Sequence, residues 1–335
     1  MTLVPWSGQR FVVAGGGGFL GSWFVRRLLA DGARVLSLQR SRPRSVFSFS
    51  AEVAERLSFA ETDLCDPGPV ASLIAGAYRG ADALICCAAM DGNSRYKAEH
   101  SSVILARNTE IVSTVLGLAR QLQIRDVVLL SSSEVYSPSC RPPISETSPY
   151  AGFGEPGGNG YVMSKVCSEL LGFWAAKQYG LRVYCPRLSS VYGLDDPRSG
   201  PYARVIPAMI ERIRSGREVE IWGDGSDRRT FVYVEDAVRG ILEVLCQRLT
   251  GPINVGTRES IGIADLARVV AEVFGRSSEG RGRPGSGVEQ GVGLLDLTKW
   301  EAAIDFEPRS LETGLRGMEA MLRVREGGGG AQVPG

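Results

Sequence analysis

The sequence predicts an α/β protein built on a doubly wound parallel sheet, with a smaller C-terminal α/β lobe. Short apolar runs alternate with helical patterns through the first half of the chain, which is typical of a parallel sheet with helices on both faces. A run of glycines separates the first apolar run from the first helical pattern. The 335 residues, 44% of them apolar, can also bury a sizeable core.

The individual elements follow from the spacing of apolar residues. Residues 10–14 form the first predicted strand, and apolar side chains at helical spacing follow from Phe19 to Leu29. The run at 83–88 is apolar throughout, as expected for a strand that is buried on both faces. Further strands are predicted at 34–38, 57–60, 126–131 and 182–188, and further helices at 70–78, 103–122 and 161–179.

The rhythm of the sequence changes after Arg187. Short predicted strands at 219–222, 231–234 and 253–255 are separated by helical patterns at 204–215, 235–247 and 263–274. We therefore assign residues 1–187, with part of 225–250, to the main sheet domain. The smaller lobe takes residues 188–224 and 251–322, and residues 323–335 are expected to form a disordered tail.

Composition excludes several classes of function. The net charge of +1 is too small to attract nucleic acid or an anionic membrane surface non-specifically. One His and no Cys-x-x-Cys pair argue against a metal site, and seven scattered cysteines are typical of a reduced, cytoplasmic protein. The apolar run from Ala83 to Met90 is too short to cross a bilayer. We expect a soluble protein with no nucleic-acid or membrane partner.

The glycine-rich turn has the sequence Gly15-Gly-Gly-Gly18-Phe-Leu-Gly21, which fits Gly-x-x-Gly-x-x-Gly between a strand and a helix. Glycines there let the backbone approach a pyrophosphate, which then rests on the unpaired N–H groups of the helix N-terminus. The pattern predicts a Rossmann-type dinucleotide site in residues 1–187. Its backbone contacts are expected from Gly15, Gly18, Phe19, Leu20 and Gly21.

The residues after the second and third strands indicate which dinucleotide is bound. NAD-binding proteins commonly carry a carboxylate at the end of the second strand, whereas this chain has Gln39, Arg40 and Arg42. Cations in place of a carboxylate favour a ribose 2′-phosphate, so we expect NADP to be favoured over NAD. The alternative is that both arginines belong to a solvated loop. Asp63 and Leu64 are placed to contact the adenine.

Candidate catalytic residues occur at Ser132 and in Tyr161-Val-Met-Ser-Lys165. Tyr and Lys four residues apart lie on one helical face, and an ammonium stabilises a phenolate, so we expect Lys165 to lower the pKa of Tyr161. Tyr161 would then act as a base, and Lys165 would also bind the nicotinamide ribose. Ser132, at the end of the fifth strand, would face the same crevice.

Together these motifs resemble the extended short-chain dehydrogenase/reductase family, in particular its NAD(P)-dependent nucleotide-sugar epimerases and dehydratases. The resemblance covers residues 9–322. Further matching pieces are Arg187-Leu-Ser-Ser-Val-Tyr-Gly193, Val205-Ile-Pro207, Trp222-Gly-Asp-Gly225, Arg229-Thr-Phe-Val-Tyr-Val-Glu-Asp236, Asn254-Val-Gly256 and Leu311-Glu-Thr-Gly-Leu315. The chain departs from the family pattern at Ala14, in Cys86-Cys-Ala-Ala89 and at Ser190.

The resemblance implies roles for individual residues. Ser132, Tyr161 and Lys165 would be catalytic, Ala88 would contact the cofactor, and the stretch 204–222 would hold the nucleotide base. The remaining residues that would bind a nucleoside-diphosphate sugar are Ser133, Ser190, Val205, Trp222, Arg229 and Arg283. We also expect a homodimer formed by the helices at 103–122 and 161–179, as is common in this family.

Glu134 bears on which reaction the enzyme performs. Ser-Ser-Glu134 resembles the Thr-Ser-Glu of GDP-mannose 4,6-dehydratases and UDP-glucuronate decarboxylases, in which the carboxylate assists chemistry beside a ketone. We expect oxidation at the sugar 4-position, followed by 4,6-dehydration or epimerisation with help from Glu134. Alternatives are a decarboxylase, a 4-ketosugar reductase and, in a different class, a non-catalytic NADP-binding regulatory protein. Epimerase/reductases like GDP-fucose synthase use a Cys and a His at two positions that hold Glu134 and Asp195 here, so their mechanism cannot be transferred. A Glu134/Asp195 pair could still do acid–base work, and the alternative for Asp195 is a capped turn.

Overall fold

A computed structural model describes residues 6–40, 50–66, 76–152, 154–155, 158–197, 200–275, 281–283 and 293–327. Its main feature is a parallel sheet in the order β11-β7-β5-β4-β1-β2-β3, with the short β6 also paired to β7. The strands are β1 Arg10–Ala14, β2 Arg34–Gln39, β3 Leu57–Glu61, β4 Ala83–Cys86, β5 Asp126–Leu129, β6 Ser131–Ser132, β7 Arg182–Leu188 and β11 Gly251–Val255. The predicted doubly wound parallel sheet is confirmed.

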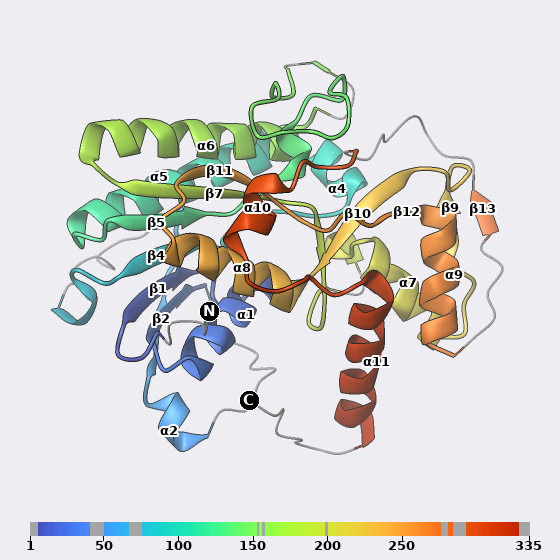
Figure 1. The fold of residues 1–335 in the computed structure, drawn as a ribbon, viewed down its shortest axis with the longest axis horizontal. Helices are drawn as coiled ribbons and strands as arrows, with labels where there is room; N and C mark the ends of the chain where they lie inside the picture. The colour runs from blue at the N-terminus through green and yellow to red at the C-terminus, as the bar shows by residue number, and fades with distance from the viewer. Residues whose placement is uncertain are drawn as a thin grey trace.

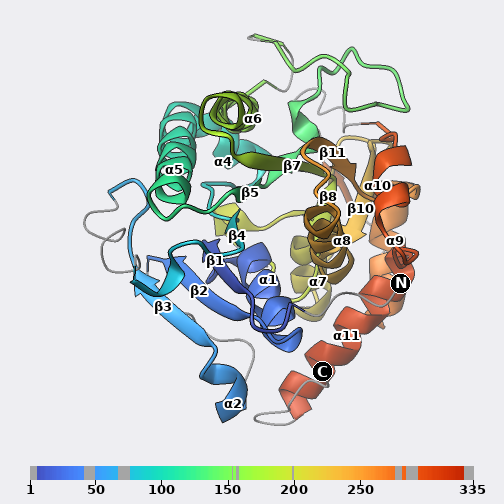
Figure 2. The same cartoon turned by 60° about the vertical axis from the view of Figure 1, so that its left-hand side comes forward.

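Helices cover both faces of this sheet (Figures 1 and 2). On one face α5 packs against α6, and on the other α1 packs against α8. The apolar residues predicted at strand and helix spacing form two buried clusters, one for each face. The helices are α1 Phe19–Ala30, α5 Ser101–Gln121, α6 Gly160–Tyr179 and α8 Val234–Cys246, with α2 Ala51–Ala54 beside β3 and α10 Thr298–Ala303 against α8 and β11.

The smaller lobe lies at the right of Figure 1 and contains two small sheets. Its strands β12, β10 and β8 form one sheet, and β13 pairs with β9 in the other. The strands are β8 Ser190–Tyr192, β9 Glu220–Trp222, β10 Arg228–Tyr233, β12 Ser260–Gly262 and β13 Arg281–Arg283, and the helices are α7 Val205–Arg214, α9 Ile263–Val273 and α11 Leu311–Gly327. The predicted C-terminal α/β lobe is thus present.

The structure corrects two of the predicted domain boundaries. We placed residues 251–255 in the smaller lobe, but β11 pairs with β7 and extends the main sheet, because α8 covers the sheet and returns the chain to its edge. Of the stretch 225–250, part of which we assigned to the main domain, α8 packs on the main sheet and β10 pairs with β8 in the small sheet. Residues 323–327 continue α11 and are not a disordered tail, while 328–335 lie outside the described residues.

Two segments differ from the sequence-based elements in ways that bear on the site. Residues 94–99, for which no element was predicted, form the short helix α4, Ser94–Glu99, which Asn93 caps by accepting a hydrogen bond from the Tyr96 N–H at 2.9 Å. Two short 3₁₀ helices, η1 Ser133–Val135 and η2 Gly200–Tyr202, flank the same region. The predicted helix at 70–78 lies mostly outside the described residues.

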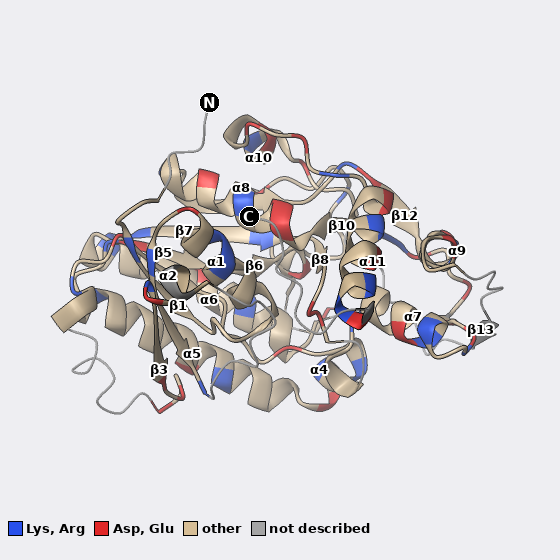
Figure 3. Ribbon diagram, turned by 90° about the horizontal axis from the view of Figure 1, so that it is seen from below, with Lys and Arg blue, Asp and Glu red and all other residues tan. Residues whose placement is uncertain are grey.

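By length and composition alone, the 21-residue helix α5 is long and apolar enough to cross a membrane. In the structure it packs against α6, β4 and β5, with buried side chains such as Ile104, Val112 and Val115. That pattern is typical of the core helix of a globular domain. Basic and acidic residues are interspersed along the chain (Figure 3).

Candidate active site

The glycine loop between β1 and α1 has the geometry of a phosphate-binding turn. Gly15 has a φ of +82°, and a Cβ placed on Gly21 would lie only 2.1 Å from the Gly15 carbonyl oxygen. The N-cap of α1 is Gly18, which has no side chain to bond the first N–H groups of the helix. Those N–H groups, near Phe19 and Leu20, can therefore bind an anion. The loop and helix therefore fit the pyrophosphate of a dinucleotide.

The ends of β2 and β3 lie beside this loop. The side chain of Gln39 is buried, and its Oε1 accepts a hydrogen bond of 2.8 Å from the Ser37 hydroxyl. Arg40, the next residue, is exposed. After β3, the Asp63 carboxylate accepts a hydrogen bond of 3.0 Å from the Cys65 N–H, which lowers the pKa of Asp63. Arg42 lies outside the described residues.

Two apolar residues complete the cofactor side of the cleft. Leu64 is buried in the core cluster that covers one face of the sheet. Ala88 follows β4 and lies so close to the loop that a Cβ on Gly15 would be 2.7 Å from the Ala88 backbone nitrogen. The predicted cofactor residues thus gather at the carboxyl ends of β1 to β4, the edge at which open α/β sheets bind ligands.

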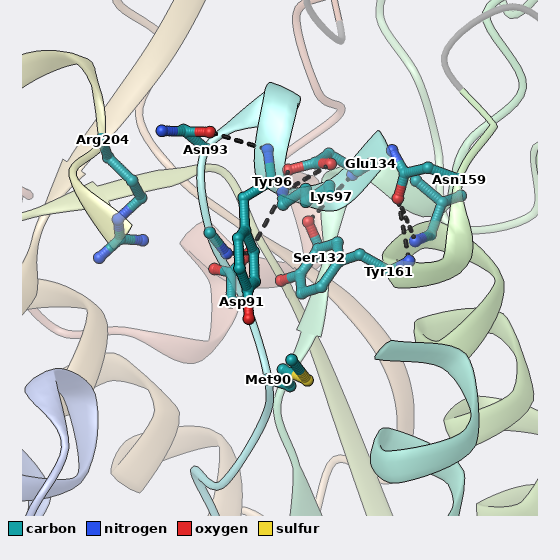
Figure 4. Close-up of polar contacts among 12 residues, drawn as sticks. Met90, Asp91, Asn93, Tyr96, Lys97, Ser132, Glu134, Asn159, Tyr161 and Arg204 are labelled. Atoms are coloured by element: carbon teal, nitrogen blue, oxygen red, sulfur yellow. Dashed lines mark hydrogen bonds and ion pairs between the residues drawn. The ribbon is translucent and has the colours of Figure 1, made fainter. Parts of the chain in front are cut away.

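The predicted catalytic residues come from two neighbouring elements. Ser132 ends β6, and its hydroxyl accepts a hydrogen bond of 3.2 Å from the Glu134 N–H at the start of η1. Tyr161 lies in the first turn of α6, which Asn159 caps by accepting hydrogen bonds from the N–H groups of Tyr161 and Val162. Figure 4 shows Ser132, Glu134 and Tyr161 gathered in one place.

Lys165 follows Tyr161 by one turn, as predicted. Its ammonium nitrogen lies 5.5 Å from the centroid of the Tyr161 ring and donates a hydrogen bond of 2.8 Å to the Leu130 carbonyl. Burial lowers the pKa of Lys165, because a charged ammonium is poorly solvated there. The carbonyl contact fixes the side chain between β5 and α6.

The sequence analysis missed a second lysine, Lys97 of α4. Its ammonium nitrogen lies 3.9 Å from the centroid of the Tyr161 ring, closer than that of Lys165. It also donates hydrogen bonds of 2.8 and 3.0 Å to both carboxylate oxygens of Glu134, and it lies 3.3 Å from an oxygen of Asp91. Burial alone would lower the pKa of Lys97, but these two carboxylates raise it well above its ordinary value. The two carboxylates thus favour the charged form of Lys97.

The state of Tyr161 differs from our expectation. Burial raises the pKa of Tyr161, as does the negative charge of Asp91, and the nearby Lys97 only partly offsets them. The pKa of Tyr161 thus lies above its ordinary value, whereas we expected a pKa below it. The sequence shows the lysine one turn away but not how deeply the phenol is buried. A raised pKa favours the protonated phenol, the form that can donate a proton to a substrate oxygen.

Arg204, another residue whose part in the site we did not predict individually, closes the opposite side (Figure 4). Its guanidinium donates a hydrogen bond of 2.7 Å to Asp196 and lies 5.1 Å from the centroid of the Phe19 ring. Asp196 is buried, which raises its pKa to about 6. Asp195 has a φ of +72° and pairs with Arg325 of α11 at 2.8 Å. This geometry is that of a turn residue, as we interpreted it. The ion-pair partner of Asp195 is Arg325, not a group of the site around Glu134.

The predicted substrate residues are spread along the small lobe. Val205 begins α7 next to Arg204, and Ser190 on β8 lies beside β10, where Phe231 is its partner in register. Arg229 on β10 pairs with Asp227 at 3.0 Å. Ser133, buried at the start of η1, lies next to Ser132.

The last two predicted substrate residues lie on neighbouring strands. Trp222 on β9 is the register partner of Arg283 on β13, and the side chains of both lie outside the described part of the chain. The substrate roles of these residues stay predictions.

Comparisons with known proteins agree with this geometry. Residues 11–256 match the model of the family described as the NAD dependent epimerase/dehydratase family. The chain is 39% identical over 321 residues to a dTDP-4-dehydro-6-deoxy-D-allose reductase of Streptomyces bikiniensis, covering 94% of this chain and 96% of the relative. A reductase of the same name from another Streptomyces is 38% identical, covering 97% of this chain and 100% of that protein.

Solved structures agree with the same fold. A dTDP-glucose 4,6-dehydratase from Streptomyces venezuelae, solved with NAD bound, is 28% identical with a TM-score of 0.77, covering 95% of this chain and 98% of that one. A UDP-glucose 4-epimerase from Thermotoga maritima is 24% identical with a TM-score of 0.80, covering 95% of this chain and 100% of that one.

Proposed function

Because the chain belongs to the NAD dependent epimerase/dehydratase family, we propose that it is a 4-ketoreductase of nucleotide-linked 6-deoxyhexoses. The two reductases that match it over nearly its whole length act, by name, on a dTDP-4-dehydro-6-deoxy sugar. A bound nicotinamide cofactor would supply the hydride, held by the glycine loop and the ends of β2 to β4. The substrate would be the keto sugar attached to a nucleoside diphosphate.

The chain's own residues would supply the proton. Reduction of a ketone needs a proton donor beside the carbonyl oxygen, and Tyr161, whose pKa is raised by burial, lies beside Ser132 (Figure 4). Ser132, on the facing strand end, would hold the same oxygen by a hydrogen bond. Lys165 and Lys97 place positive charge near the phenol and stabilise the phenolate that remains after proton transfer.

The observation that carries the proposal is the double hydrogen bond from Lys97 to Glu134. A 4,6-dehydratase, or an epimerase that inverts the carbon beside the ketone, needs a base that removes a hydrogen from that carbon. In this chain the carboxylate in that place has both oxygens bonded to one ammonium. Reduction needs no such base, so the arrangement favours reduction.

A direct assay tests the proposal. Purified protein is mixed with NADPH or NADH and with dTDP-4-dehydro-6-deoxyallose or its 3-epimer dTDP-4-dehydro-6-deoxyglucose, and absorbance at 340 nm and product mass are followed. We expect one cofactor oxidised for each sugar reduced and a product heavier by two hydrogens. The proposal fails if no cofactor is consumed, or if NDP-hexoses instead lose water or change configuration with no net consumption of cofactor.

The second candidate is the dehydration or epimerisation that we first expected. One observation favours it: the Glu134 side chain is 42% exposed, so a substrate can reach it. The same assay, run with oxidised cofactor and dTDP-glucose, separates the two because dehydration gives a product lighter by one water.

We propose that NADP is favoured over NAD. Arg40 is exposed at the end of β2 and free to approach a 2′-phosphate, with which a charge-assisted hydrogen bond contributes about 1.5–3 kcal/mol. Replacing Arg40 by Ala should therefore weaken NADP binding about tenfold and leave NAD binding nearly unchanged. Titration of both cofactors into both proteins measures this, with Arg27→Ala on α1 as a control. Equal affinity of the unmodified protein for the two cofactors would contradict it.

We also propose a homodimer through α5 and α6. Ile104, Val115 and Leu118 of α5 are buried within the chain, so they are not available to a partner. Exposed apolar residues cluster on α6, where Leu170, Phe173 and Trp174 are 46, 50 and 60% exposed. Such a patch is typical of an interface.

Light scattering tests the dimer. We expect the mass of two chains at micromolar concentration and the mass of one chain for Trp174→Asp, because a charge would be buried at the centre of the contact. Val324→Asp, which alters a residue 52% exposed on α11, is the control and should stay dimeric. A monomeric unmodified protein contradicts the proposal.

The cytoplasm is the compartment that we propose. All seven cysteines lie among the described residues and are unpaired, as in proteins kept under reducing conditions.

A further inference from the structure

We propose that Lys97 is a specificity-determining residue, which keeps Glu134 from removing hydrogen beside the substrate ketone and so limits the enzyme to reduction. The inference rests on the proposed function, because it concerns what happens to a keto sugar bound in the same site. It goes beyond that function by assigning to one residue of α4 the choice between reduction and chemistry at the neighbouring carbon.

The Lys97 ammonium contacts three groups at once: the Glu134 carboxylate, the Asp91 carboxylate and the Tyr161 ring. Both Glu134 oxygens accept hydrogen bonds from its ammonium, Asp91 lies 3.3 Å from it, and the Tyr161 ring lies beneath it at 3.9 Å. The Lys97 side chain is only 10% exposed, so water does not replace these contacts easily. A proton taken from the substrate would neutralise Glu134 and so weaken both of its charge-assisted hydrogen bonds from Lys97.

The step that Lys97 would suppress is removal of a proton from the carbon beside the ketone. The Glu134 carboxylate would take a proton from the carbon next to the ketone, and the C–H electron pair would move into the C–C bond as the ketone becomes an enolate. In D₂O the carboxyl group exchanges its proton with solvent and returns a deuteron to the same carbon. The ketone is restored, with one hydrogen replaced by deuterium and no net oxidation.

The short helix that carries Lys97 is itself held by contacts at both of its sides. Asn93 caps the helix, and its own N–H donates a hydrogen bond of 2.8 Å to the carbonyl of Pro201 in η2. The Tyr96 ring also meets the Tyr202 ring edge-on at 5.4 Å. These contacts hold the backbone of α4, which carries Lys97, against the segment before α7.

The test measures exchange separately from reduction. Each protein is incubated in D₂O with NADP⁺ and dTDP-4-dehydro-6-deoxyglucose, a pair that cannot react by hydride transfer, and deuterium in the recovered sugar is followed by NMR and mass. We expect Lys97→Met to raise the exchange rate about tenfold or more over the unmodified protein. The double variant Lys97→Met with Glu134→Gln should return to the low rate.

Lys97→Arg is the matched control, because it keeps a cation opposite Glu134 and should keep exchange low. Thermal unfolding and NADP⁺ titration show that the Met variant is folded and binds cofactor. Exchange in Lys97→Met that does not exceed that of the unmodified protein, or that persists in the double variant, overturns the inference. Failure of the unmodified protein to oxidise NADPH with the keto sugar overturns the proposed function instead, and the exchange result still stands by itself.

Discussion

Replacing Tyr161 by Phe should lower turnover with the keto sugar by about a thousandfold, within the range that general acids contribute. The change removes the hydroxyl that would give its proton to the 4-oxygen, and it keeps the ring on which Lys97 rests at 3.9 Å. Cofactor affinity should stay nearly the same. Rates of NADPH oxidation at saturating substrate, together with a cofactor titration, measure both quantities.

A tyrosine on the same helix provides the control for this variant. Tyr179 ends α6, is 41% exposed and lies under Arg120 rather than in the crevice. Tyr179→Phe should turn over like the unmodified protein. If Tyr161→Phe keeps turnover within about tenfold, which is 1.4 kcal/mol in the barrier, another group gives the proton.

The largest loss of stability is expected from the buried ion pair between α6 and β7. Arg187 and Glu169 are 1 and 3% exposed, and the carboxylate also accepts hydrogen bonds from the hydroxyls of Ser131 and Tyr150. Glu169→Gln leaves the guanidinium charged, buried and without its counter-ion. We expect the free energy of unfolding to fall by about 3–5 kcal/mol, measured by urea denaturation.

Two further proteins make this prediction specific. Glu312→Gln, in an exposed pair with Arg316 on α11, should leave the urea midpoint unchanged. Replacing both partners, with Glu169→Leu and Arg187→Met, should cost less stability than Glu169→Gln alone, because no uncompensated charge remains. A single Gln variant as stable as the unmodified protein would mean that water or another group compensates Arg187.

Much of the fold could be predicted because the strands of the main sheet are apolar runs and the long helices have clear periodicity. The same reasoning located the glycine loop, Ser132, Tyr161 and Lys165, since each follows a recognisable strand or helix start. It could not place β11 or β10, because which strand pairs with which depends on how the chain crosses the sheet. Those pairings leave no mark on local spacing.

Lys97 was missed for a different reason. Helix α4 has six residues, too few for apolar periodicity, and its partner Glu134 lies 37 positions along the chain. The one local signal was Asn93, a good capping residue before a polar run. The proton state of Tyr161 was equally out of reach, because it depends on burial and on Asp91, which the fold brings together from separate segments.

The close approach of α5 and α6 has an entropic consequence. At Gly160, which directly precedes Tyr161, a Cβ would lie 1.8 Å from the Ser101 carbonyl oxygen, so the two helices touch backbone to backbone where they begin. The first turn of α6 is thereby immobilised when the chain folds, and its conformational freedom is already lost before any ligand arrives. Substrate binding then need not order the proton donor, so more of the contact energy remains as affinity.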